Sequence, residues 1–109
     1  MPMFIITGNY TAAAMKGMVT SPSDREVATR SLVEAGGGKL LNYYLTTGDT
    51  DFLMVVSSPD GIDMLGPLIA AGATGTVANL KTVRAFTSAE FTAAQKKAGE
   101  IAAQFKPAG

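Results

Sequence analysis

Cysteine, histidine and tryptophan are all absent from this sequence of 109 residues. The lack of cysteine excludes disulfides, cysteine-based zinc or iron–sulfur sites and a thiol nucleophile. The lack of histidine removes the commonest general base and a frequent metal ligand. Most familiar catalytic chemistries of small domains are therefore excluded, and we expect no metal site and no cofactor.

Net charge is also absent, because nine basic residues balance nine acidic ones and only 17% of the chain is charged. Nucleic-acid affinity comes mainly from clustered lysine and arginine side chains. The sequence contains no block of basic residues of that kind. We therefore expect no nucleic-acid partner.

Long hydrophobic runs are missing as well. No apolar stretch approaches the roughly 20 residues that span a bilayer. The residues from Met1 to Met15 lack the positively charged flank that precedes the core of a signal peptide. We therefore expect a cytoplasmic protein that does not associate with membranes.

Apolar residues make up 47% of the chain, while its charged fraction is well below the roughly 25% typical of soluble domains. This length and composition predict a single domain over residues 1–109 with a hydrophobic core of its own. Part of the apolar excess is expected to lie in a subunit interface.

Four segments rich in β-branched and aromatic residues are predicted to be strands: residues 3–10, 39–47, 51–57 and 76–86. The second and third are joined by a short turn-forming connection, Gly48-Asp49-Thr50, which predicts an antiparallel hairpin. The first and third contain nearly unbroken apolar runs, as expected for central strands that are buried on both faces.

Helices are predicted between these strands. The segment after Thr11 is expected to form a short helical turn at most, and a longer helix is expected to begin with Ser23 as its N-cap. The glycines at 36–38 end that helix, since glycine readily takes the left-handed conformation found at helix C-termini. A further helix is predicted from Ser58 to Gly72, where apolar residues recur at helical spacing.

The C-terminal segment also reads as a helix. It begins with a capping box, Thr87-Ser88-Ala89-Glu90, and carries an apolar stripe from Phe91 to Phe105. This stripe is expected to cover the chain's own sheet or a neighbouring subunit.

The predicted order is βαββαβ with an extra C-terminal helix, which defines an α+β, ferredoxin-like domain with a four-stranded antiparallel sheet. In this arrangement the helices cover only one face of the sheet. The other face would expose alternate residues of apolar strands, and a second sheet packed on it would bury them. We therefore expect a homodimer with its sheets face to face, with higher assembly left open.

Three segments resemble the GYD-domain family: Phe4 to Thr11, Gly37-Gly38-Lys39-Leu40, and Thr82 to Thr87. The resemblance implies a dimeric α+β barrel of ferredoxin-like subunits, and it implies no particular activity. The family's naming motif is Gly-x-Tyr-Asp, and this chain has Gly48-Asp49-Thr50-Asp51. Thr50 therefore replaces the motif's tyrosine, which puts any role of that phenol in question here.

Two charged residues are candidates for ligand binding. Asp51 begins a strand that becomes apolar at once, so its carboxylate is expected near the end of the sheet. Arg84 lies in the segment that resembles the family, and its planar guanidinium could hold Asp51 or a substrate carboxylate. Strict alternation places Lys81 and Arg84 on opposite faces of their strand, so they cannot form one anion clamp.

Neutral polar residues complete the candidate ligand-binding set. Tyr44, Asn9 and Asn42 could supply hydrogen bonds to a ligand in the same region. Tyr43 and Tyr44 face opposite ways, so at most one of them lines any given cavity. Catalytic residues are not assigned, and packing in the core or in an interface is the alternative role for each of these side chains.

The favoured function is a homodimeric binding or structural module that holds a small apolar or weakly anionic molecule between its sheets or at its loop ends. The alternative is a cofactor-independent enzyme, an oxygenase or isomerase, that acts on a small aromatic compound. Such an enzyme needs a cavity containing two or more of these five candidate residues. A regulatory sensor of an anionic metabolite, with basic residues at the dimer seam, is a third alternative.

Overall fold

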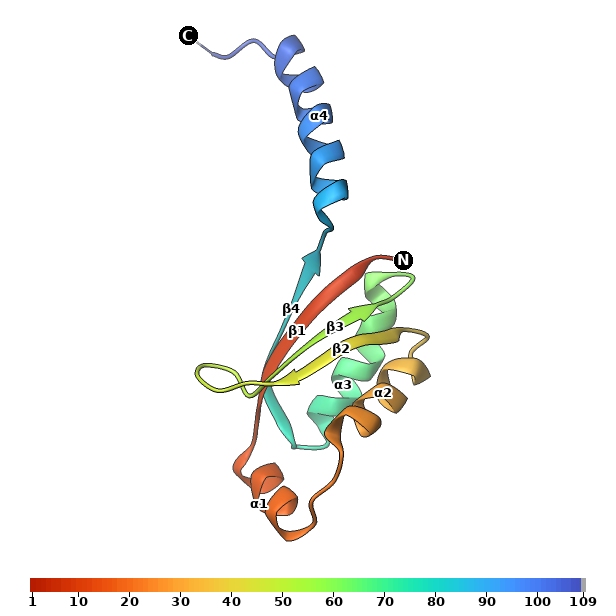
Figure 1. Ribbon diagram of the computed structural model, residues 1–109, viewed down its shortest axis with the longest axis vertical. Coiled ribbons are helices and arrows are strands. Elements are labelled where there is room, and N and C mark those ends of the chain that lie inside the picture. Colours follow the sequence, from red (N-terminus) through yellow and green to blue (C-terminus); the bar gives the residue numbers. More distant parts are fainter. Residues whose placement is uncertain (109) are drawn as a thin grey trace.

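The computed structural model describes residues 1–108 and contains a four-stranded antiparallel sheet (Figure 1). The strands are β1 (Met3–Tyr10), β2 (Lys39–Leu45), β3 (Phe52–Ser57) and β4 (Val77–Ala85). Their order across the sheet is β2-β3-β1-β4, so β1 and β3 are central. The predicted ferredoxin-like α+β arrangement is confirmed, including the position of the two most apolar strands.

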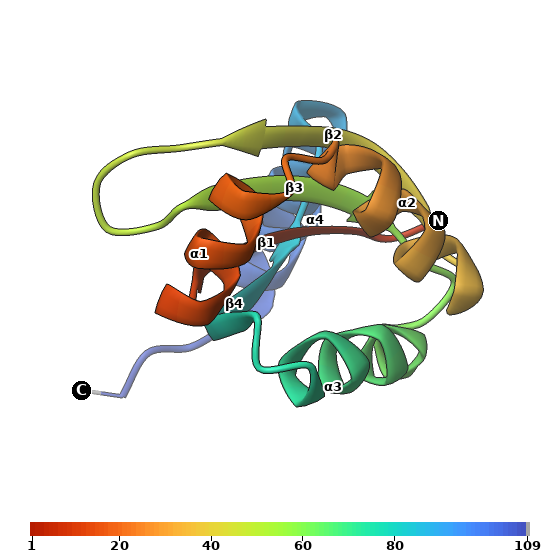
Figure 2. The ribbon, with the colours of Figure 1, turned by 90° about the horizontal axis from the view of Figure 1, so that it is seen from below.

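The helices are α1 (Ala12–Thr20), α2 (Arg25–Ala35), α3 (Leu65–Ala73) and α4 (Ser88–Gln104), and a 3₁₀ turn, η1 (Gly61–Met64), leads into α3. Figures 1 and 2 show α2 and α3 on one face of the sheet. The other face carries no helix among the described elements, as predicted.

The prediction of at most a short turn after Thr11 is wrong, because α1 is a helix of nine residues. The Thr11 hydroxyl accepts a hydrogen bond from the amide of Ala14 at 3.2 Å and so caps the helix. The methyl group of Ala14 is buried. A good cap and a buried contact therefore stabilise a helix whose sequence alone shows little amphipathic pattern.

Helix α2 begins one residue later than predicted. Asp24, not Ser23, is the N-cap, and its Oδ1 accepts from two amides of the first turn at 2.9 and 3.4 Å. At the other end Gly37 has a φ of 84°, as predicted for a left-handed helix end. Gly36 serves close packing, because a Cβ there would lie 2.5 Å from Cγ of Pro67 in α3.

The hydrophobic core lies between the sheet and the helices α2 and α3. Its buried members come from three strands and from η1: Ile6, Leu40, Phe52, Met54, Val56 and Met64. These side chains share the helix-covered face of the sheet.

The opposite face, which we call the open face, is a second apolar surface. Ile5 pairs with Val55 on one side and with Val83 on the other, which forms an aliphatic row across the sheet. Tyr44 and Val83 on this face are 57% and 56% exposed. An apolar sheet face of this kind normally packs against something.

Helix α4 runs away from the body of the domain beyond the end of β4 (Figure 1). The longest dimension of the chain is 63 Å and its radius of gyration is 18.2 Å, against about 13 Å for a compact domain of this length. The predicted capping box of Thr87 and Glu90 is present. No residue of α4 is buried within the described chain, so the helix does not cover its own sheet.

Candidate functional site

Asn9 and Asp51 are brought together at the end of the β2–β3 hairpin. Oδ2 of Asp51 accepts from the amide of Tyr10 at 2.9 Å and from Nδ2 of Asn9 at 3.3 Å. The same Asn9 nitrogen donates to the carbonyl of Asp49 at 3.0 Å. These contacts fasten the hairpin loop to β1 where β1 changes its pairing with β4, between Thr7 and Asn9. These contacts are of the kind that stabilises a loop.

Asn42 and Tyr44 are neighbours on the open face of β2, where Nδ2 of Asn42 lies 3.4 Å from the hydroxyl of Tyr44. Both side chains are exposed. The alternation of Tyr43 and Tyr44 is as predicted, with Tyr43 packed against the core and Tyr44 on the open face.

Arg84 is separated from the other predicted site residues. It pairs with Phe4 near the start of β1, whereas Asp51 contacts the end of that strand. Its Nη1 donates to the carbonyl of Met3 at 3.2 Å and to that of Ala85, and its guanidinium lies 4.3 Å from the ring centre of Phe86. No ion pair between Asp51 and Arg84 is found in residues 1–108.

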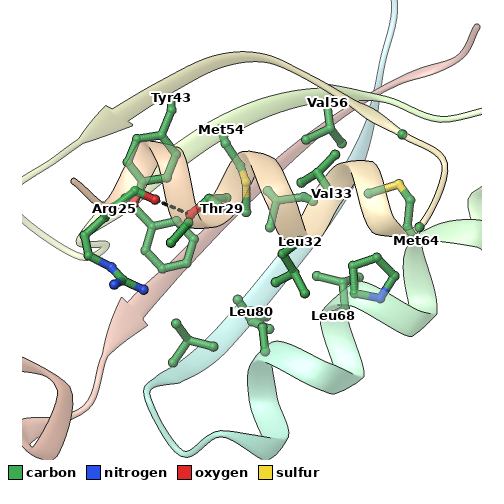
Figure 3. Close-up of a pocket in the computed structure, with 18 of the residues that line it drawn as sticks. Arg25, Thr29, Leu32, Val33, Tyr43, Met54, Val56, Met64, Leu68 and Leu80 are labelled. Atoms are coloured by element: carbon green, nitrogen blue, oxygen red, sulfur yellow. Dashed lines mark hydrogen bonds between the residues drawn. The ribbon is translucent and has the colours of Figure 1, made fainter. Parts of the chain in front are cut away.

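A cavity of about 170 Å³ lies on the helix-covered face, between the sheet and the helices α2 and α3 (Figure 3). Its walls are mostly apolar side chains from strands and helices, among them Ile6, Leu32, Val33, Met54, Leu68 and Leu80. Within the described chain, none of the five predicted site residues lines it. The cavity is therefore neither between sheets nor at the loop ends, where the sequence placed the ligand.

Polar side chains gather at one end of this cavity, with Arg25, Thr29 and Tyr43 together and Met64 at the far end (Figure 3). The hydroxyls of Tyr10 and Tyr43 lie 2.5 Å apart. Both rings pack against Phe52, with ring centres 5.2 and 6.5 Å from it. We call Tyr10, Arg25, Thr29 and Tyr43 the polar end of the cavity.

The phenol of Tyr10 is held in its protonated form. Burial raises the pKa of Tyr10 well above its ordinary value, and the hydrogen bond with Tyr43 raises it further. The nearby guanidinium of Arg25 acts in the opposite direction but is outweighed. At neutral pH the Tyr10 hydroxyl is therefore a hydrogen-bonding group and not a base.

The sequence predicted none of the four residues of the polar end as ligand-binding, and Arg25 is the charged residue among them. It occupies the first position of α2, and its Nη1 donates to Ser23 Oγ at 3.3 Å. Its Nε is buried without a hydrogen-bond partner, and it takes part in no ion pair among the residues that the structure describes. The sequence does not indicate this burial, because Arg25 lies in a polar first turn and its Nε becomes buried only when α2 packs on the sheet.

The chain belongs to the GYD domain family, whose sequence pattern it matches over residues 4–94. The match includes β3, all of β1 except Met3, the hairpin with Thr50 and all the residues of the polar end. No functionally curated protein sequence matches the chain.

Two solved structures share the fold at low sequence identity. MtbAldR has a TM-score of 0.58 at 11% identity, covering 80% of this chain and 54% of its own. A transcriptional regulator from Neisseria meningitidis, solved in complex with L-Met, has a TM-score of 0.56 at 14% identity, covering 80% of this chain and 51% of its own. This chain thus spans about half the length of either protein, and the likeness concerns the fold alone.

Two further features bear on function. No helix within residues 1–108 has the length and apolar character to cross a membrane. The described residues contain no group of acidic side chains arranged to hold a metal ion.

Proposed function

We propose that this protein binds a small, mostly apolar molecule in the cavity between the sheet and the helices α2 and α3. The observation that carries the proposal is the form of that cavity, a mostly apolar chamber of about 170 Å³ in which Tyr10, Arg25, Thr29 and Tyr43 gather at one end, with Ser57, Ser58 and Asp63 elsewhere in its lining. Ligand sites commonly combine an apolar wall with a few convergent polar groups. An apolar cavity of about 150 Å³ is large enough to hold benzene, so the ligand is about the size of one aromatic ring with a substituent.

We further propose that the protein is a homodimer joined through the open face. The aliphatic row of Ile5, Val55 and Val83 supports this, because a partner's equivalent row would cover it in a symmetric pair. Helix α4 supports it as well, since Phe91 and Ile101 are 62% and 58% exposed and have no cover within the described part of their own chain. In the proposed dimer each α4 packs on the partner subunit.

A binding role is favoured over the enzymatic alternative. An oxygenase or isomerase of the predicted kind needs at least two of Asn9, Asn42, Tyr44, Asp51 and Arg84 in one cavity, and the cavity here contains other residues. The polar end offers a protonated phenol and a cation, which orient a ligand without supplying a base. The neighbour solved with L-Met supports small-metabolite binding by this fold in general terms. The expectation of no nucleic-acid partner stays a prediction.

Binding is tested with benzyl alcohol, a neutral probe of suitable size, by chemical-shift changes in NMR spectra. The wild-type protein is compared with Ala71→Phe, which fills the cavity from α3, and with the control Ala73→Phe on the exposed side of the same helix. We expect saturable binding by the wild type and the control and loss of binding in Ala71→Phe. Binding that survives Ala71→Phe would place the probe elsewhere and contradict the proposal.

The dimer is tested by native mass spectrometry of gently purified protein, which also reports any co-purifying molecule. Val83→Asp puts a charge on the open face, whereas Thr82→Asp puts it on an exposed position of the opposite face. We expect the wild type and Thr82→Asp to be dimers and Val83→Asp to be monomeric. A monomeric wild type would contradict the face-to-face packing.

A further inference from the structure

The positive charge of Arg25 at the polar end of the cavity is not neutralised by its neighbours. The carboxylate of Asp24 is engaged in capping α2, and that of Glu26 forms an ion pair with Arg30 at 3.1 Å. Arg25 makes no ion pair among residues 1–108, and it stands at the positive end of the α2 dipole. The electrostatic character of this end of the cavity therefore favours an anion.

The buried Nε of Arg25 also lacks an acceptor. Nε is enclosed by the protein and has no surface for a ligand to contact, so a ligand would meet the terminal nitrogens of Arg25, of which Nη1 also donates to Ser23 Oγ at 3.3 Å. Guanidinium groups bind carboxylates through a planar fork of parallel N–H donors, which suits a two-oxygen headgroup better than a single hydroxyl.

The tyrosine pair adds one more donor beside this arginine. Tyr10 and Tyr43 together carry two hydroxyl protons, and only one of them lies in the hydrogen bond between the two oxygens. The other proton is free to point at a ligand. Because burial keeps Tyr10 protonated, this donor persists at neutral pH.

The polar end also lies beside an opening. A second hollow of about 240 Å³, between α1 and the start of α2, shares Tyr10, Arg25 and Thr76 with the cavity. A charged headgroup placed against Arg25 can thus stay near solvent while the apolar body of the ligand occupies the cavity. That division avoids the full desolvation of an anion.

We propose that the ligand of this cavity is a small monocarboxylate with an apolar body, whose carboxylate accepts hydrogen bonds from Arg25 and from the Tyr10–Tyr43 pair. This inference rests on the proposed binding function, since it names the ligand class of the same cavity. It also makes Arg25 the residue that determines specificity, a role that none of the five sequence-based candidates fills.

The experiment uses two matched pairs of probes, benzoate with benzamide and hexanoate with hexanamide, which differ in charge but little in shape. Affinities are measured at neutral pH for the wild-type protein and for Arg25→Gln, Arg25→Lys and the control Lys39→Gln. Lys39 is exposed on β2, lies outside the cavity lining and forms no ion pair in the described chain. The ratio of carboxylate to amide affinity is the readout, because a general loss of stability affects both members of a pair alike.

We expect the wild type and Lys39→Gln to prefer the carboxylate by about tenfold or more, as a charge-assisted hydrogen bond provides. Arg25→Gln should bind both members equally, and Arg25→Lys should keep part of the preference. Equal binding of acid and amide by the wild type would overturn the carboxylate inference and leave the cavity function standing. Failure of all four probes and of benzyl alcohol to bind would overturn both.

Discussion

The hydroxyl groups of Tyr10 and Tyr43 lie 2.5 Å apart although the two residues are 33 positions apart in the chain. The pair joins the end of a central strand to the edge strand β2 across the ring of Phe52. The pair therefore contributes both to the packing of the sheet and to the hydrogen-bonding groups of the cavity.

The pH dependence of stability follows from the raised pKa of Tyr10. Its pKa is 10.0 when unperturbed and higher in the folded protein. The folded state therefore holds this proton more tightly, and the stabilisation is fully present below pH 10 and declines as the pH rises further. We expect Tyr10→Phe to flatten the alkaline fall of the free energy of unfolding, measured by urea denaturation, relative to the wild type.

The tyrosinate absorbance provides an independent check. The chain has three tyrosines, and Tyr10→Phe should remove a component that titrates above the ordinary range of a phenol. Removal of a component that titrates near pH 10 instead would show that Tyr10 is not perturbed in solution.

A second prediction concerns the contact between α2 and α3 that closes the cavity. A Cβ at Gly36 would lie 2.5 Å from Pro67 Cγ and 3.1 Å from the carbonyl oxygen of Asp63. We expect Gly36→Ala to lower the free energy of unfolding by about 1–3 kcal/mol through overpacking. It should also weaken probe binding, because α3 must move outward.

Gly72→Ala is the matched control for this change. Gly72 lies within α3 and keeps an ordinary helical backbone, and a Cβ there would meet no atom within 4 Å outside its own helix. We expect the substitution to raise the free energy of unfolding by up to about 1 kcal/mol through helix propensity. Equal effects of the two substitutions in thermal and urea denaturation would contradict the close approach of the helices.

Much of the fold could be predicted because local signals and the global arrangement agree. The apolar runs of β1 and β3 identified the central strands, Thr87 and Glu90 identified the start of α4, and the number of helices showed that one sheet face stays open. Each of these features is a pattern of residues close together in the chain, so it can be recognised in the sequence.

The cavity could not be predicted, because its lining depends on tertiary packing and strand register. The pairing of β2 with β3 shifts between Leu40 and Asn42, and this irregularity determines that Tyr43 rather than Tyr44 faces the core. The alternation of the two tyrosines could be predicted, but the face that each one takes could not. Arg25 acquires its buried Nε only when α2 packs on the sheet. Such tertiary placements leave no periodic pattern in the sequence.

A third prediction separates structural from ligand-binding roles among the sequence-based candidates. Asp51→Ala removes the acceptor of the Tyr10 amide and of Asn9, and we expect it to cost about 1–3 kcal/mol of stability. Arg84→Met removes a cation stacked near Phe86, with an expected loss of about 0.5–1 kcal/mol.

Neither substitution should alter the carboxylate-to-amide affinity ratio, since neither side chain reaches the cavity. Affinity ratios are therefore measured at a temperature where both variants are fully folded. A changed ratio in either variant would return that residue to the binding site.

The last prediction concerns α4. The helix is well capped and carries exposed apolar residues along one side, including Phe91 and Ile101, yet nothing in residues 1–108 covers it. Isolated helices of this length are marginal in water, because packing of an apolar face supplies most helical stability. We therefore expect the double variant Phe91→Ser/Ile101→Ser to weaken the dimer by at least about tenfold in analytical ultracentrifugation.

The control is Lys96→Ser, which changes the opposite side of the same helix and should leave the dimer intact. Circular dichroism distinguishes a lost interface from a lost helix. If α4 packs on the partner, the double variant loses helical signal as it dissociates, because the released helix is no longer stabilised by packing. A double variant that stays dimeric with full helicity would show that the open face alone holds the subunits together and that α4 has a different partner.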